Sequence, residues 1–194
     1  MASSYESPAA FHIRPIQAAD LWTLKTFLCE LSPGTLYFRF GRLSVPMWTE
    51  QEWIRLCSPD AERFAHFVAT APSEPGRYAI VGMGRLVCEA GDQQSAEFSI
   101  VVADHLQHQG LGTKLIHALV GEARRRALRS MYGDVLPSNQ AMIRFCKGLG
   151  FVSHRCPDDE RIHRMVLSIK SKQSEKNVAD TSKPLKQLAA QYVS

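Results

Sequence analysis

Residues 100–113 read IVVADHLQHQGLGT, and this stretch decides the fold. It begins with β-branched residues typical of a strand and continues through a polar turn with two closely spaced glycines, Gly110 and Gly112. A helix is expected to follow, because apolar residues then recur at helical spacing. Glycines at such a junction let the backbone approach a ligand closely, and the free N–H groups of the first helical turn bind phosphate groups. The order differs from the GxGxxG of dinucleotide folds and from the GK[ST] of P-loops, so neither NAD nor ATP is expected.

The chain before this stretch alternates between strand and helix signals. Asp20 is expected to cap a first helix, Gly41 to close a second short helix or turn, and Thr49 with Glu52 to form the capping box of a third. Turn-forming residues separate the β-rich runs and predict an antiparallel meander. The expected elements are strands at 11–14, 64–70, 78–88 and 97–102, and helices at 21–31, 35–40 and 50–58.

The chain after this stretch continues the mixed pattern. The expected elements are a helix at 111–127, a strand at 130–135, a helix at 139–149 ended by Gly150, and strands at 151–156 and 162–169. The whole order predicts an α/β (α+β layered) fold with a single mixed, mostly antiparallel sheet of six to seven strands and helices on both faces.

Composition limits the class of protein. The chain has 194 residues, a formal net charge of +4 and 45% hydrophobic residues, which predicts one globular domain at 11–168. A flexible N-terminus at 1–10 and a Lys-rich, flexible tail at 169–194 are expected to flank it. No apolar run approaches the roughly 18 residues of a membrane span, no secretory signal is visible, and the five cysteines lack a CxxC pair. We therefore expect a cytoplasmic protein with reduced thiols that binds neither membranes nor nucleic acid.

The glycine motif and its surroundings resemble a known superfamily. Gln107, Gly110 and Gly112 form Q-x-x-G-x-G after a strand, and an Asn-initiated helix ending in LGF follows. This arrangement resembles the acetyl-CoA-binding core of the GCN5-related N-acetyltransferases (GNAT), over about residues 11–168. The chain is similar in particular to the acetyltransferase domain of bacterial protein lysine acetyltransferases, through LSP at 31–33, YFRF at 37–40, AEF at 96–98 and NQAM at 139–142. Unlike the longer members, this chain is expected to have no attached regulatory domain.

The resemblance implies the GNAT fold, acetyl-CoA as co-substrate and no metal. The central strand would pair with the pantetheine arm through backbone groups, and the glycine loop would hold the pyrophosphate on N–H groups. Asn139 would hydrogen-bond the pantetheine, although it also fits a helix N-cap, and Phe145 would border the same site or belong to the core. The residues implied in acetyl-CoA binding are Ile100, Val101, Val102, Gln107, His108, Gln109, Gly110, Leu111, Gly112, Thr113, Asn139 and Phe145.

Glu97 is the candidate catalytic residue. A lysine-type amine with a reference pKa of about 10.4 is almost wholly protonated at neutral pH, and removing its proton costs about 4–5 kcal/mol. A carboxylate at the edge of the acetyl-CoA site can accept that proton, directly or through water, and desolvation within the sheet would raise its pKa toward the useful range. Glu97 could instead be an exposed carboxylate at the strand end. The alternative bases are Glu89 and His66.

Other polar residues are weaker candidates. Many family members have a tyrosine general acid where this chain has Cys146, which is expected to be core packing. His105 and His108 are interpreted as loop residues because no metal partner lies at a recognised spacing. Lys114 and the arginines at 124–126 could reach the adenosine phosphate, but such charges usually form a solvated helix face.

The leading hypothesis is an acetyl-CoA-dependent N-acetyltransferase that acts on protein lysine side chains by direct attack with general base assistance. The alternatives are acetylation of a small amine, and a non-catalytic acyl-CoA-binding regulatory module. The sequence leaves the amine acceptor, the preferred acyl chain and the oligomeric state open.

Overall fold

An antiparallel meander forms the centre of the molecule, as the alternating residues predict. It consists of β2 (Phe64–Pro72), β3 (Tyr78–Val87) and β4 (Ser95–Val102). The computed structural model describes residues 11–58, 60–73, 75–88, 94–156, 159 and 161–169. At one edge β1 (His12–Pro15) pairs antiparallel with β2.

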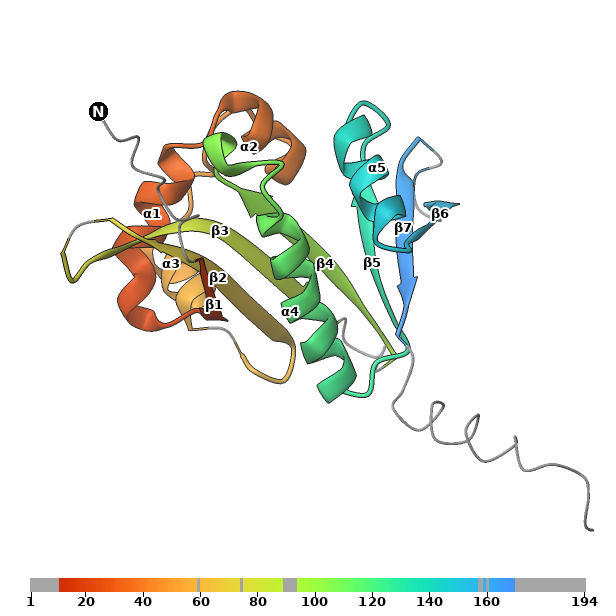
Figure 1. Cartoon of the computed structure of the whole chain (residues 1–194), viewed down its shortest axis with the longest axis horizontal. Helices are drawn as coiled ribbons and strands as arrows, with labels where there is room; N and C mark the ends of the chain where they lie inside the picture. The colour runs from red at the N-terminus through yellow and green to blue at the C-terminus, as the bar shows by residue number, and fades with distance from the viewer. Residues whose placement is uncertain are drawn as a thin grey trace, which may run out of the picture.

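The second half of the sheet comes from the C-terminal part of the chain. The strands β5 (Ser130–Val135), β6 (Val152–Arg155) and β7 (His163–Ser168) complete the order β1-β2-β3-β4-β5-β7-β6 (Figure 1). The pairing of β4 with β5 is parallel, and every other pairing among the described residues is antiparallel. The predicted fold class, one mixed and mostly antiparallel sheet, is therefore confirmed.

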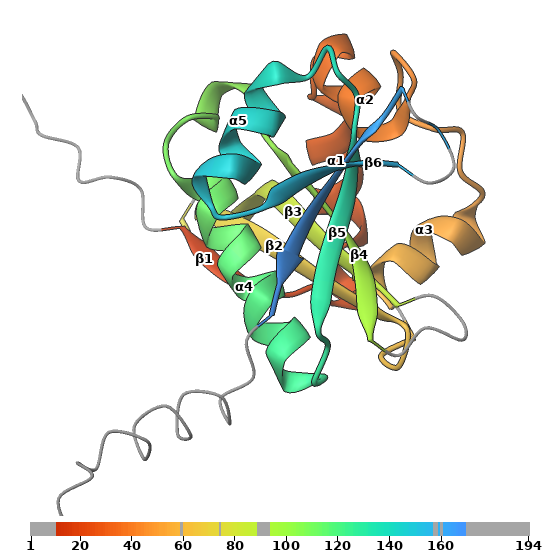
Figure 2. The ribbon, with the colours of Figure 1, turned by 90° about the vertical axis from the view of Figure 1, so that its right-hand side faces the viewer.

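Helices cover both faces of this sheet. On one face lie α4 (Leu111–Arg125) and α5 (Gln140–Gly148), which share a core with the inner sheet residues. The other face carries the N-terminal helices, and Figure 2 shows α2 and α3 on the side of the sheet away from α4 and α5. The N-terminal helices are α1 (Leu21–Cys29), α2 (Pro33–Phe40) and α3 (Glu50–Cys57), and short 3-10 turns lie at Ala18–Asp20 and Asp104–Leu106.

The packing of α4 against the meander follows from the apolar period of its sequence. Leu115, Ile116 and Leu119 are fully buried, and they contact the sheet where it carries small residues. A side chain at Gly84 would begin 3.4 Å from Leu119, so the glycine lets the helix lie close to β3. This close packing fixes the position of the first turn of α4 relative to β4.

Several local expectations need correction. Asp20 lies at the start of α1 but does not cap it; the buried carboxylate accepts hydrogen bonds from Arg14 at 2.7 Å and from the Tyr78 hydroxyl at 2.6 Å. Helix α4 ends at Arg125, because Ala127 adopts a left-handed φ of 56°. The Thr49 capping box and the closure of α2 at Gly41 are confirmed.

The last two strands are each shorter than their predicted spans of 151–156 and 162–169. The predicted segment 1–10 and all of the predicted tail beyond Ile169 lie outside the described residues. None of the described helices is both long enough and apolar enough to cross a bilayer.

Candidate active site

The parallel strands β4 and β5 separate after a short paired segment. Pairing among the described residues joins 95–97 to 130–132 and ends at Glu97 and Tyr132. Beyond it the strands diverge (Figure 1), and we call residues 98–102 of β4 and 133–135 of β5 the fork. Its base is filled by Phe98, because a Cβ added at Gly133 would meet that ring at 2.7 Å.

The backbone of β4 offers polar groups to the fork. The Ala103 N–H donates to the Val81 carbonyl on β3 at 2.9 Å. Because antiparallel pairing alternates along a strand, the peptide groups of Ile100 and Val102 point to the opposite side, toward β5. The Val102 carbonyl accepts a hydrogen bond from the Gln107 side chain at 3.3 Å, so the Ile100 peptide is the candidate partner for an amide-containing ligand.

The first turn of α4 lies at the end of β4 and forms a cradle for an anion. Gly110 is the N-cap, with a left-handed φ of 81° that suits glycine, and no side chain caps the helix. The N–H groups of Leu111, Gly112 and Thr113 have no acceptor within the helix. Together with the positive end of the helix dipole they can bind a phosphate group.

Gly112 brings three elements together. A Cβ at this position would lie 3.3 Å from the Phe145 ring on α5 and 3.5 Å from Ile100 on β4. Phe145 is half-buried and packs against the α4–α5 core, so it both borders the cradle and belongs to the core. The sequence left these two roles as alternatives, and the geometry allows both.

The remaining predicted binding residues divide by what their side chains do. The Asn139 side chain caps α5 by accepting from the Met142 N–H at 3.1 Å. Gln109 donates to the His105 carbonyl at 3.0 Å, and the exposed His108 has a left-handed φ of 63°. The hydrogen bonds of Asn139 and Gln109 are therefore made within the protein itself.

Asp104 ties this turn to α2, and sequence reasoning missed it. Its carboxylate accepts hydrogen bonds from Ser32 Oγ and Thr35 Oγ1, each at 2.7 Å, and from the Ser32 N–H at 2.9 Å. Partial burial opposes ionisation of Asp104, but these hydrogen bonds prevail and lower its pKa. Gln107 Nε2 joins the same network through Thr35 at 3.3 Å. Ser32 also caps α2 by accepting from the Thr35 N–H at 3.2 Å, and a local cap says nothing about a partner 72 residues away.

Glu97 lies at the base of the fork on the face opposite α4. Alternation along β4 puts Glu97, Ser99 and Val101 on the face of the N-terminal helices, while Phe98 packs with the α4 core. The Glu97 side chain is exposed. The expectation that the sheet desolvates it is therefore wrong, and the alternative of an exposed carboxylate describes the structure.

Two arginines lie near Glu97, and the sequence gave neither an individual role, although Arg39 belongs to the YFRF segment at 37–40. Arg85 lies opposite Ser99 in the β3–β4 register, and Arg39 lies in the last turn of α2. Burial, together with the Arg85 charge, lowers the pKa of Arg39 to about 10, and the Glu97 charge opposes this. Burial also lowers the pKa of Arg85, again opposed by Glu97. The three charges therefore share one site.

The alternative acids and bases are placed less favourably. His66 is buried, and burial lowers its pKa to about 4; its Nδ1 lies 2.8 Å from the Leu56 carbonyl, so it is neutral and held by the backbone. Burial raises the pKa of Cys146 to about 12, which makes this core thiol a poor general acid. Glu89 lies outside the described residues.

The basic residues of α4 have mostly structural roles. Arg126 donates to the Phe64 and Ala61 carbonyls and pairs with Glu122 at 2.7 Å, so it anchors the start of β2. Lys114 is exposed and lies over the Phe11 ring. Within the described part of the chain, no group of His, Cys, Asp or Glu side chains could hold a metal ion.

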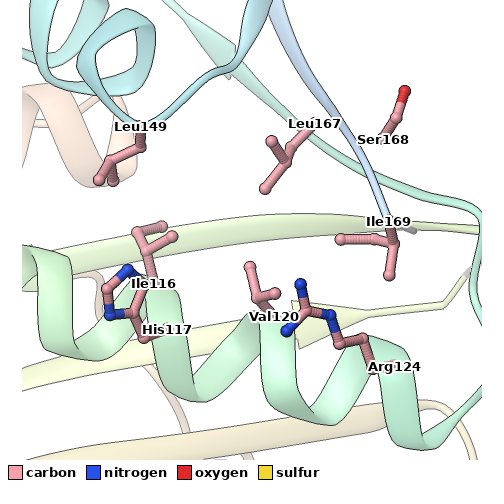
Figure 3. A pocket seen from close by; sticks show the side chains of 8 residues that line it. All are labelled: Ile116, His117, Val120, Arg124, Leu149, Leu167, Ser168 and Ile169. Carbon is pink, nitrogen blue, oxygen red and sulfur yellow. The ribbon is translucent and has the colours of Figure 1, made fainter. Parts of the chain in front are cut away.

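A cavity of about 470 Å³ lies away from the fork, between α4, α5 and the end of β7. Figure 3 shows Val120 and Ile116 facing Leu167 across it, with the Arg124 guanidinium at its border. None of the predicted acetyl-CoA-binding residues lines this cavity. It therefore does not belong to the candidate site.

Comparisons with known proteins agree with this geometry. A family model described as the acetyltransferase (GNAT) family matches residues 28–151. The chain is 36% identical to acetyltransferase PA5475 of Pseudomonas aeruginosa over 162 residues, which cover 80% of this chain and 83% of the relative. It is 28% identical to acetyltransferase Pat of Mycolicibacterium smegmatis over 142 residues, which cover 73% of this chain and 41% of that longer relative.

A solved structure supports the fold. The GNAT domain of S. lividans PAT is similar to this chain with a TM-score of 0.71 and 21% identity, covering 84% of this chain and 99% of that domain. The sequence matches establish the family, and the structural match supports the fold. The chain therefore belongs to the GNAT acetyltransferase family and catalyses acetyl-CoA-dependent acetyl transfer.

Proposed function

We propose that the protein transfers the acetyl group of acetyl-CoA to lysine side chains of proteins, with Glu97 as general base. The observation that carries this proposal is the position of Glu97 at the base of the fork, opposite Tyr132, on the face away from the α4 cradle. A donor held on the cradle and passing through the fork would present its thioester on the face that carries Glu97.

The donor side of the proposal rests on backbone groups. The free N–H groups at the start of α4 suit the pyrophosphate of acetyl-CoA, and the Ile100 peptide suits an amide of the pantetheine arm. Asn139 and Phe145 would border the arm from α5. Side chains of His108 and Gln109 contribute little in this arrangement, since both are exposed.

The acceptor side requires a proton transfer. The acceptor ammonium gives one proton to the Glu97 carboxylate, directly or through water, and the neutral nitrogen attacks the thioester carbon. The C–N bond forms, the nitrogen loses its second proton to solvent, and the C–S bond breaks. The released thiolate takes a proton from solvent, because Cys146 is too weak an acid to supply it. The developing oxyanion would be stabilised by a backbone N–H of β4.

Exposure favours a protein acceptor over an enclosed metabolite. Glu97 is open to solvent, and the nearby α2 presents Tyr37 and Phe38 with 41% and 45% of their surface exposed. Small-molecule sites instead bury most of their ligand. An open carboxylate near a helix that exposes aromatic rings suits a lysine side chain on a larger surface.

The test is single-turnover acetylation of lysine peptides by wild type and Glu97→Gln. Glutamine keeps the shape but cannot accept the proton, so the rate should fall by roughly 10²–10⁴ while acetyl-CoA affinity stays unchanged. Glu50→Gln, at an exposed position on α3, is the matched control and should retain the wild-type rate. Retention of more than about a third of the rate in Glu97→Gln would contradict general base catalysis by this residue.

A further inference from the structure

Arg39 and Arg85 differ from the other partly buried arginines of the protein. Arg14 pairs with Asp20, Arg126 with Glu122, and Arg164 with Asp134, each at 2.7 Å. Within the described residues, neither Arg39 nor Arg85 forms a hydrogen bond or an ion pair, and the Nε atom of each is buried without an acceptor. Their guanidinium groups lie over the Phe40 and Phe64 rings, which leaves the Nε donors without an acceptor. Buried N–H groups of charged side chains are costly when unpaired, so each position still lacks a hydrogen-bond acceptor.

The two arginines face the candidate acceptor position. Arg85 is opposite Ser99, and Val87 is opposite Glu97, so Arg85 and Glu97 are diagonal neighbours on one face of the sheet. The Cα atoms of such a diagonal pair lie roughly 7–8 Å apart across the two strands. Arg39 lies in the last turn of α2, which packs against β4, and its charge interacts with those of Arg85 and Glu97. The site therefore has two cations beside one carboxylate.

This charge arrangement disfavours a simple cationic acceptor. Lysine brings an ammonium group into a place where two guanidinium groups already outnumber Glu97. An anionic group on the acceptor would offset that repulsion and satisfy the unpaired N–H donors. Guanidinium groups bind carboxylates through directional, charge-assisted hydrogen bonds. A singly charged carboxylate also suffers less repulsion from Glu97 than a doubly charged phosphate would.

We propose that Arg39 and Arg85 recognise a carboxylate on the acceptor, close to the amine that receives the acetyl group. Building on the proposed function, this defines the substrate class as lysine with an acidic neighbour. The carboxylate belongs either to an adjacent Asp or Glu of a protein or to the α-carboxylate of a free amino acid. Arg39 and Arg85 act as specificity-determining residues and not as catalytic residues.

Binding tests the proposal without requiring turnover. The protein, saturated with CoA so that no reaction occurs, is titrated calorimetrically with two lysine peptides that differ only by Glu or Gln beside the lysine. The Glu peptide should bind at least about tenfold more tightly to wild type, as expected for charge-assisted hydrogen bonds. Arg39→Gln and Arg85→Gln should each reduce this preference to about threefold or less.

Controls separate recognition from folding. Arg55→Gln removes the same charge from an exposed position on α3 and should keep the wild-type preference. Arg39→Lys keeps a charge but loses the planar fork, and should give an intermediate preference. Thermal melting of each variant shows whether it is folded. If Arg39→Gln does not fold, Arg39→Lys serves as the test of Arg39.

Two further outcomes decide the source of the carboxylate and the link to the proposed function. Tighter binding of free lysine than of lysine amide, without a Glu peptide preference, assigns the carboxylate to a free amino acid. Equal affinity within both pairs, or a preference that persists in both Gln variants, overturns the proposal. If the Glu peptide binds preferentially but is never acetylated, carboxylate recognition stands and lysine acetylation fails.

Discussion

At the residue scale, the two glycines of the motif meet different constraints. Gly110 is required by its backbone conformation, because its φ is +81° while no atom lies near an added Cβ. Gly112 has ordinary helical geometry and is restricted by space, since Phe145 and Ile100 approach to 3.3 and 3.5 Å. In the G-x-G spacing, the first glycine is therefore needed for the backbone conformation of the turn and the second for close packing. The sequence alone does not distinguish these two requirements.

The packing demand at Gly112 predicts a binding defect. In Gly112→Val the added atoms should displace Phe145 and Ile100 and lower acetyl-CoA affinity by about tenfold or more. Gly121→Val is a matched control on the same helix, where nothing lies within 4 Å of an added Cβ, and its affinity should equal that of wild type. Calorimetry with acetyl-CoA measures both; unchanged affinity in a folded Gly112→Val would remove the cradle as the coenzyme site.

At the element scale, the Asp104 network holds α2 against the end of β4. Three hydrogen bonds from Ser32 and Thr35 converge on one carboxylate, and they connect the helix that carries Arg39 to the turn that begins the cradle. The network therefore couples the positions of the acceptor side and the donor side.

This network makes stability depend on pH. The folded-state pKa of Asp104 is lowered, so its ionised form stabilises the protein above the unfolded value of about 3.9 and this contribution disappears as the pH falls below it. Asp104→Asn should reduce the free energy of unfolding at pH 7 by about 1 kcal/mol, because Asp104 is exposed and solvent screens its interactions. The melting temperature should fall by a few degrees. The difference from wild type should shrink as the pH falls below about 4.

A double-mutant cycle gives the control for this effect. Ser32→Ala removes one donor of the same network, so its effect should be smaller in Asp104→Asn than in wild type. Strictly additive effects of the two substitutions, measured by thermal melting at pH 7, would show that the carboxylate does not hold α2.

The sequence predicted most elements, and it singled out a contiguous donor motif and Glu97 as a candidate base, but it gave Arg39 and Arg85 no role. Helices and strands follow from local periodicity, and the cradle is a contiguous motif. Each of these features can therefore be identified from a short stretch of sequence. Arg39, Arg85 and Glu97 come from three elements, and their proximity depends on the register of β3 with β4 and on the packing of α2. The exposure of Glu97 likewise depends on which helices cover its face, which no local pattern records.

At the scale of the whole molecule, the sheet separates the proposed donor side from the proposed acceptor side. The cradle lies with α4 and α5 on one face, while Glu97, Arg39 and Arg85 lie with the N-terminal helices on the other. The fork between β4 and β5 is where a bound molecule could extend from one face of the sheet to the other. All of this architecture is contained within residues that precede Lys170.

The position of β7 at the end of the described residues predicts a truncation result. Strand β7 pairs with both β5 and β6, and Ile169 is buried with its N–H donating to the Arg129 carbonyl at 2.7 Å. The Lys-rich sequence that follows has few apolar side chains to bury. A chain ending at Ser171 should therefore melt within a few degrees of the full chain and bind acetyl-CoA equally well, whereas a chain ending at Met165 loses half of β7 and should not fold. A drop of about ten degrees or more for the chain ending at Ser171 would show that the last residues pack on the domain or join two copies of it.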